Sequence, residues 1–134
     1  MGYVINITHD QFPEQKADLN SLVSIVLNGK QVAAQVVRSD AESPYERILK
    51  TREGLYIADS EVDGFKLPEQ RSYLNKRAGV CFHFNSNCEL DGKIVRADKT
   101  EPFRTVIQLD DGRVVYDTEC QFREKWTLYG KSKD

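Results

Sequence analysis

Residues 36–62 read VVRSDAESPYERILKTREGLYIADSEV, and residues 94–120 read IVRADKTEPFRTVIQLDDGRVVYDTEC. The second stretch lies 58 positions after the first and aligns with it without a gap. Chance rarely places Arg, Asp, Pro and Gly together in one register, so the chain is predicted to contain an internal duplication. Identical residues occur at Val37 and Val95, Arg38 and Arg96, Asp40 and Asp98, Pro44 and Pro102, Gly54 and Gly112, Asp59 and Asp117, and Glu61 and Glu119.

The match continues upstream with small changes of offset. Pro-Glu-Gln-Lys at 13–16 corresponds to Pro-Glu-Gln-Arg at 68–71. VSIVLN at 23–28 corresponds to VCFHFN at 80–85. The duplicated unit therefore begins well before the stretch in which it is clearest.

A chain of 134 residues has room for one ordinary domain or two very small ones. We predict a first repeat over residues 1–66, including an N-terminal lead, and a second repeat over residues 67–134, including a C-terminal tail. These repeats are expected to meet or merge because a unit of this size buries only a modest fraction of its surface.

Each copy has the pattern of an antiparallel meander. Val80, Phe82 and Phe84 alternate with other residues, which is the period of two expected of a strand. Glycine after charged residues, at Gly54 and Gly112, predicts tight hairpins. The expected strands are 23–28, 33–40, 46–51 and 54–61 in the first copy, and 80–85, 92–98, 104–109 and 112–119 in the second.

A short helical segment is expected around each Pro-Glu-Gln, since proline suits the first position of a helix. Leu19, Leu22, Val23 and Val26 also fit a helical stripe. The strict alternation in the duplicate favours a strand there instead.

The predicted fold is mainly β: an internally duplicated antiparallel meander that forms two SH3-like small barrels, or one merged barrel with pseudo-twofold symmetry, with short helical segments. Closure into a barrel removes the exposed sheet edges of a lone meander. Association of whole chains through remaining edges is also expected to be possible, so a homo-oligomer is one prediction.

The pattern G-K-I-V-R-A-D, followed by F-R-T-V-I-Q-L-D-D-G-R-V-V-Y, resembles the core of a Tudor or SH3-like small β-barrel. The resemblance is strongest at residues 91–120, while in residues 33–62 the Asp-Gly turn becomes Glu53-Gly54. The resemblance implies a non-catalytic binding module. Tudor-type barrels often use an aromatic cage for methylated side chains, for which Phe103, Tyr116 and Trp126 are the candidates here.

Composition narrows the classes of function. The formal net charge is −2 and the isoelectric point about 5.7, which weighs against a nucleic-acid-binding protein. The longest apolar-rich run, LVSIVL at 22–27, is too short to span a bilayer. With no secretory signal in MGYVINITHD and an odd number of cysteines, we expect a cytoplasmic protein with free thiols and no membrane partner.

Catalytic and metal-binding patterns are weak. Cys81, His83, Cys88 and Cys120 could be written as a zinc site, but there is no C-x-x-C pair. Cys81 with His83 or His9 could be a nucleophile and base, but two residues on one strand are poorly placed for a hydrogen bond. We expect small buried cysteines, no metal, no cofactor and no enzymatic activity.

Ligand-binding candidates come from the repeat. Arg38 and Arg96 each precede an aspartate by two residues, so each copy is expected to hold an Arg–Asp pair on one strand face. That pair either braces the turn or frees two arginines to grip an anion. Tyr45 and Phe103 follow the turn prolines and could stack on a ring. The candidate ligand-binding residues are Arg38, Tyr45, Arg96, Phe103, Arg104 and Trp126.

The leading hypothesis is a non-enzymatic binding or regulatory protein that engages another protein through duplicated small barrels. Three alternatives stay open. One is capture of a small anionic ligand such as a nucleotide, through the paired arginines and aromatic loops. The others are a nucleic-acid-binding module and a phage or mobile-element inhibitor of a host factor.

Overall fold

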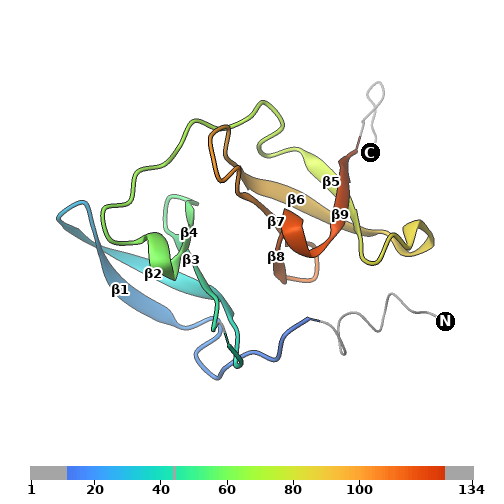
Figure 1. The fold of residues 1–134 in the computed structure, drawn as a ribbon. Coiled ribbons are helices and arrows are strands. Elements are labelled where there is room, and N and C mark those ends of the chain that lie inside the picture. Colours follow the sequence, from blue (N-terminus) through green and yellow to red (C-terminus); the bar gives the residue numbers. More distant parts are fainter. Residues whose placement is uncertain (1–11, 44, 126–134) are drawn as a thin grey trace. The chain divides into compact units, whose positions relative to one another are not determined.

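The computed structural model describes residues 12–43 and 45–125, which form two compact units that divide between Pro68 and Glu69 (Figure 1). The predicted boundary between residues 66 and 67 lies two residues before this division. Each unit is a single antiparallel sheet.

The first unit is a four-stranded meander in the order β1-β2-β3-β4. A 3-10 helix, η2, follows its last strand. The elements are β1 (Leu22–Leu27), β2 (Lys30–Ser39), β3 (Arg47–Thr51), β4 (Tyr56–Ala58) and η2 (Asp59–Glu61).

The second unit has the same meander plus a fifth strand, in the order β8-β7-β6-β5-β9. The last strand returns to pair with the first. The elements are β5 (Arg77–Cys81), η3 (Ser86–Cys88), β6 (Leu90–Ala97), β7 (Thr105–Leu109), β8 (Val114–Tyr116), η4 (Asp117–Glu119) and β9 (Gln121–Glu124).

The predicted fold class is therefore confirmed: the protein is mainly β, its strands are antiparallel and its helical segments are short. Both sheets are open over the described residues, because no pairing joins β4 to β1 or β8 to β9. Strand rather than helix is also the outcome for residues 22–27.

Two local predictions are wrong. No helix forms at either Pro-Glu-Gln; Gln15 and Gln70 instead make isolated antiparallel bridges to Asp40 and Asp98. The predicted strand at 80–85 ends at Cys81, since His83 and Phe84 take left-handed backbone angles (φ of 54° and 58°). The Phe84 N–H donates to the Gln121 side chain at 2.6 Å, and this contact fixes the turn.

A bulge shapes the long second strand of each sheet. The register of β2 with β3 shifts between Val36 and Arg38, and that of β6 with β7 shifts between Ile94 and Arg96. Such an extra residue bends a strand and redirects the side chains that follow it. Val36 and Arg38 are both buried as a result, which brings the arginine into the interior beside the core.

Each sheet covers its own apolar core with alternating side chains. In the first unit Ala34, Val36 and Leu49 form a buried cluster, against which Val23 and Ile25 pack. Over the described residues, the second unit has more buried apolar residues than the first. Its buried residues include Val80, Ile94, Val106, Ile107, Leu109, Val114 and Val115.

Gly92 on β6 lies against the backbone of β7. A Cβ atom built at Gly92 would lie 2.8 Å from the Gln108 carbonyl oxygen. Replacing a strand glycine by alanine ordinarily stabilises a protein, because it restricts the unfolded chain. We predict the opposite for Gly92→Ala: a loss of about 1–3 kcal/mol in the free energy of unfolding, from overpacking. Urea unfolding followed by circular dichroism measures it.

Ala34→Gly is the matched control, since Ala34 holds the equivalent position in the first unit. It should cost about 1–2 kcal/mol, from backbone entropy together with the loss of one buried methyl group. A Gly92→Ala protein as stable as the unsubstituted chain would contradict the close approach of β6 and β7.

Candidate functional site: two aromatic loop tips on buried ion pairs

The loops that follow β2 and β6 are each anchored by a buried ion pair. Arg38 Nε donates to Asp40 Oδ1 at 3.0 Å and Nη2 donates to Oδ2 at 3.2 Å. Arg96 binds Asp98 through the same two nitrogens, both at 3.0 Å. All four side chains are at most 5% exposed. Bidentate pairing of this kind fixes the orientation of both partners.

A glutamine completes each anchor from a distant part of the chain. Gln15 Nε2 donates to Asp40 Oδ1 at 2.8 Å, and Gln15 Oε1 accepts the Ser39 N–H at 2.7 Å. Gln70 makes the same two bonds, to Asp98 Oδ1 and from the Ala97 N–H, both at 2.7 Å. These glutamines are structural residues that the sequence analysis missed, although the repeated Pro-Glu-Gln marked them.

The arginine candidates therefore lie inside. Arg38 and Arg96 are each 2% exposed, so a ligand in solvent meets neither guanidinium group. Of the two interpretations of the Arg-x-Asp repeat, this geometry fits the one in which the ion pair braces the turn. An anion could be gripped by these arginines only after an ion pair had opened.

The two loop tips share an unusual backbone. Tyr45 and Phe103 both have φ of 59°, in the left-handed region. Each N–H donates to the carbonyl oxygen three residues earlier at 2.7 Å, from Tyr45 to Glu42 and from Phe103 to Thr100. A bulky residue is rare in this region and costs about 1–3 kcal/mol. At both positions the interactions of the buried anchor must offset this conformational cost.

Both tip rings are exposed, and each has a cation beside it. Tyr45 is 59% exposed and Phe103 45%. The Lys16 ammonium lies 5.5 Å from the centre of the Tyr45 ring. The Arg71 guanidinium lies 5.6 Å from the centre of the Phe103 ring. The equivalent positions in the two units thus present the same pair, an aromatic ring and a positive charge, which we call the aromatic–cation tips.

The remaining candidates are placed differently. Arg104 points to Tyr116: its guanidinium lies 5.4 Å from the ring centre, and Nη1 donates to the hydroxyl at 3.3 Å. Its counterpart in the first unit is Glu46, so this contact is not duplicated. Trp126 lies outside the described residues.

The cysteines and histidine of the sequence hypothesis are not assembled into a metal site. Among the described residues, which include Cys81, His83, Cys88 and Cys120, no group of three His, Cys, Asp or Glu is placed to hold a metal ion. Burial raises the pKa of the Cys120 thiol to about 12, and it also raises the pKa of Cys81. A raised pKa disfavours the thiolate that a cysteine nucleophile needs.

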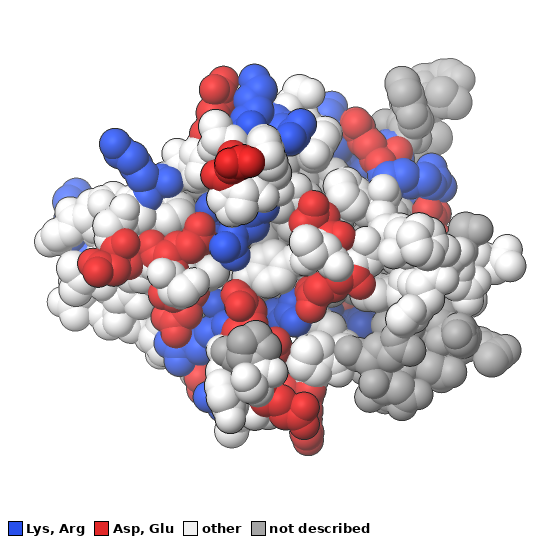
Figure 2. Space-filling view, viewed as in Figure 1, with Lys and Arg blue, Asp and Glu red and all other residues white. Residues whose placement is uncertain are grey.

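Charges of both signs are mixed on the surface. Figure 2 shows Lys and Arg interspersed with Asp and Glu, and the described part of the face in view has no continuous basic area. Several surface charges of the second unit are paired, as in Arg77–Asp110 at 2.6 Å and Arg123–Glu89 at 2.8 Å. In residues 12–43 and 45–125, no helix is long and apolar enough to cross a membrane.

Comparison of the chain with protein-family models, with curated proteins and with solved structures gives no match in any of the three. The function of the candidate site is therefore inferred from the geometry of its own residues.

The anchors should dominate the stability of the loops. We predict that Asp98→Ala lowers the free energy of unfolding by about 3–5 kcal/mol, because it leaves the Arg96 charge buried without its partner. Asp110→Ala removes an exposed partner of Arg77 and should cost at most about 1 kcal/mol. Urea unfolding of both variants tests this, and equal costs would show that the buried pair is not the anchor.

The thiols should differ in reactivity. In the folded protein at mildly alkaline pH, we expect Cys120 to react with iodoacetamide at least about a hundredfold more slowly than in urea. Labelling followed by mass spectrometry of peptides gives the rate for each cysteine. A Cys120 that reacts equally fast in both states would mean that this thiol is not buried.

Proposed function

We propose that the protein is a non-enzymatic binding protein that engages a partner protein through its two aromatic–cation tips. The observation that supports this most is the duplication of one strained feature. Tyr45 and Phe103 have the same positive φ, both rings face solvent, and a cation adjoins each ring.

The backbone conformation of the two tips is energetically costly. A chain gains little stability from a left-handed aromatic residue whose ring stays in water, whereas glycine would take the same angle freely. Such outliers collect at binding sites, where the surrounding structure holds a side chain ready for a ligand. Exposed aromatic residues are also among the commonest anchors of protein interfaces.

The chemistry of the tips indicates the kind of partner. An aromatic ring offers an apolar contact surface, and Lys16 or Arg71 beside it offers a positive charge. A partner segment that combines an apolar side chain with a carboxylate fits both groups. Two tips on one chain can hold two such segments, and the second contact is then made at a raised effective concentration.

The small-barrel resemblance supports the same class of function. In the second unit β9 returns to pair with β5, which is a step towards closing the meander into a barrel. We propose that both units are Tudor or SH3-like modules, and that such modules act here as binding domains working in the cytoplasm.

A second candidate is a small ligand with a flat ring and an anionic group, such as a nucleotide. This second candidate is favoured by the cations that lie 5.5 Å from the centre of the Tyr45 ring and 5.6 Å from the centre of the Phe103 ring. In that case the binding groups are Lys16 with Tyr45 and Arg71 with Phe103, while Arg38 and Arg96 brace the loops. Nucleic-acid binding and inhibition of a host factor stay predictions.

Glycine variants separate binding from folding. We predict that Tyr45→Gly and Phe103→Gly together abolish capture of the partner, because both rings are gone. Stability should change by less than about 1 kcal/mol, because relief of the positive φ offsets the lost ring contacts. The measurement is affinity capture with quantitative mass spectrometry, comparing the double variant with the unsubstituted chain.

Phe84→Gly is the matched control, since Phe84 is 81% exposed and also has a positive φ. Proteins retained by the control and lost by the double variant are tip-dependent partners. If the double variant captures the same proteins as the unsubstituted chain, the proposal fails. Titration with nucleotides then tests the second candidate, which requires saturable binding that the double variant lacks.

A further inference from the structure

The outer edge of β1 is open. In the order β1-β2-β3-β4, the strand β1 pairs only with β2 among the residues that the structure describes (Figure 1). Its sequence, Leu-Val-Ser-Ile-Val-Leu, contains no charge, proline or glycine. Natural proteins usually protect such an edge with lysine, proline or a bulge, because its backbone groups are ready to pair with another strand.

The second unit shows what covers the equivalent edge. There β5 is paired on its outer side by β9, in antiparallel register with Val80 opposite Phe122. The pairing corrects the alignment of residues 23–28 with 80–85: Val23 on β1 corresponds to Ala78 on β5 and not to Val80, since Val23 pairs with Ala34 and Ala78 pairs with Gly92. An antiparallel strand is therefore the structure that fits this side of the fold.

The first unit cannot supply that strand from its own equivalent segment. After η2 the chain turns at Asp63 and Gly64, where Gly64 has φ of 70°. The Phe65 ring that follows is buried, at 6% exposure. Residues 62–68 then lead to the second unit without forming a strand, so no strand of residues 12–43 or 45–125 fills the position beside β1 that β9 fills beside β5.

Apolar side chains are exposed along this edge. Leu22 is 77% exposed and Val26 62%, with Ser24 between them on the same face. Val23 and Ile25 point the other way and pack on the core. Both faces of β1 thus offer apolar surface to an added strand.

The strand is complementary to itself. When Ser24 is placed opposite Ser24 of a second copy in antiparallel pairing, Leu22 meets Val26 on the exposed face. Val23 then meets Ile25 on the core face. Directly opposed residues of an antiparallel pair point to the same side, so this register matches the inner and outer faces of both sheets. Like charges, which would oppose self-pairing, are absent from the strand.

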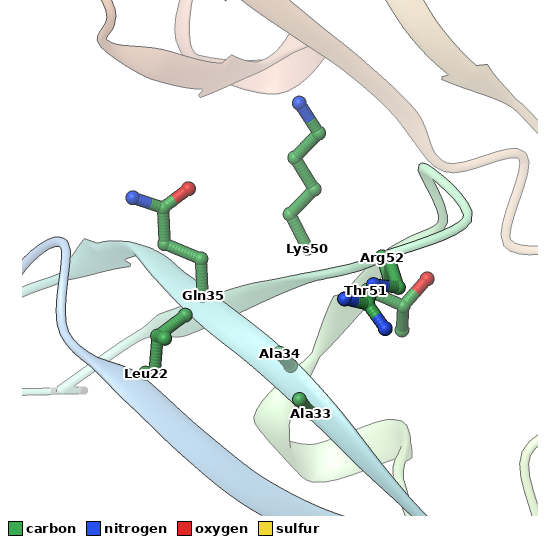
Figure 3. Close-up of a pocket in the computed structure, with 7 residues that line it drawn as sticks. All are labelled: Leu22, Ala33, Ala34, Gln35, Lys50, Thr51 and Arg52. Carbon is green, nitrogen blue, oxygen red and sulfur yellow. The ribbon is translucent and has the colours of Figure 1, made fainter.

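A shallow hollow of about 370 Å³ continues the exposed face inward from Leu22 (Figure 3). Ala33 on β2 pairs with Ser24 and shares its exposed face, and its small side chain leaves room for this hollow, which Gln35, Lys50 and Arg52 border. The two charged residues belong to β3 and the turn after it, across β2 from the edge. A valine placed opposite Leu22 therefore meets the exposed Leu22 side chain on the side away from these two charges.

We propose that two copies of the chain pair antiparallel through β1, about a twofold axis at Ser24, so that their four-stranded sheets become continuous. An isologous contact of this kind closes after two copies. Six paired residues bury less surface than a standard stable interface, so the dimer should depend on protein concentration.

The test is sedimentation velocity on the full chain over a range of concentrations. The unsubstituted protein should shift from a species of 15.4 kDa to one of twice that mass as concentration rises. Ser24→Lys and Ser24→Glu each place like charges opposite one another and should weaken the dimer about tenfold or more. An equimolar mixture of the two variants should restore it, because the charges are then opposite.

Ser72→Lys is the control, since it adds the same charge at an exposed turn of the second unit. It should dimerise like the unsubstituted chain. A monomer at all concentrations would overturn the proposal, whether residues outside the described ranges or a partner peptide cover β1. A dimer that Ser24→Lys leaves unchanged would also overturn it, because the interface would then lie elsewhere.

Discussion

The buried Arg–Asp pair is the interaction on which the rest of each unit depends. Arg38 with Asp40, and Arg96 with Asp98, stand at the ends of the long second strands, where a bulge has turned the arginine inward. Burial of two charges is costly unless each finds its partner and its remaining hydrogen bonds. Gln15 and Gln70 supply part of these bonds and thereby join the start of each unit to the end of its second strand.

This anchor explains how a strained tip persists. The loop after each pair must reverse direction within a few residues, and Asp40 and Asp98 fix where it begins. The backbone at Tyr45 and Phe103 takes the left-handed angle within that frame, so each ring is held towards solvent. Rigidity of this kind lowers the entropy that a binding residue loses when it meets a partner. In each unit the buried ion pair holds the loop that presents the exposed ring, so the chain contains this arrangement twice.

Much of the fold could be predicted from the sequence, because its signals are local. The alternation of apolar residues and the hairpin glycines predicted β2, β3, β6 and β7. The repeat at a constant offset of 58 showed that β2 corresponds to β6 and β3 to β7. What failed depends on distant contacts. The Pro-Glu-Gln segments suit a helix locally, but Gln15 finds its partner 25 residues away at Asp40. The strand at 80–85 stops early because the Gln121 side chain binds the Phe84 N–H.

The candidate site was predictable in part. Tyr45 and Phe103 were identified because each follows a repeated proline, and Arg38 and Arg96 because each precedes an aspartate. Their roles differ, since burial decides between a brace and a ligand contact, and burial follows from the bulge. Lys16 and Arg71 were missed as neighbours of the rings. Their signal was the basic residue that ends both Pro-Glu-Gln-Lys and Pro-Glu-Gln-Arg.

We propose above all that partners bind at the aromatic–cation tips. The most direct measurement is a map of chemical-shift changes in the ¹⁵N-labelled full chain on addition of a captured partner. If partners bind at the tips, the largest changes occur at residues 42–46 and 100–104, and the Nε–H signals of the buried Arg38 and Arg96 stay almost unchanged. Changes that leave both loops unaffected and gather elsewhere would contradict it.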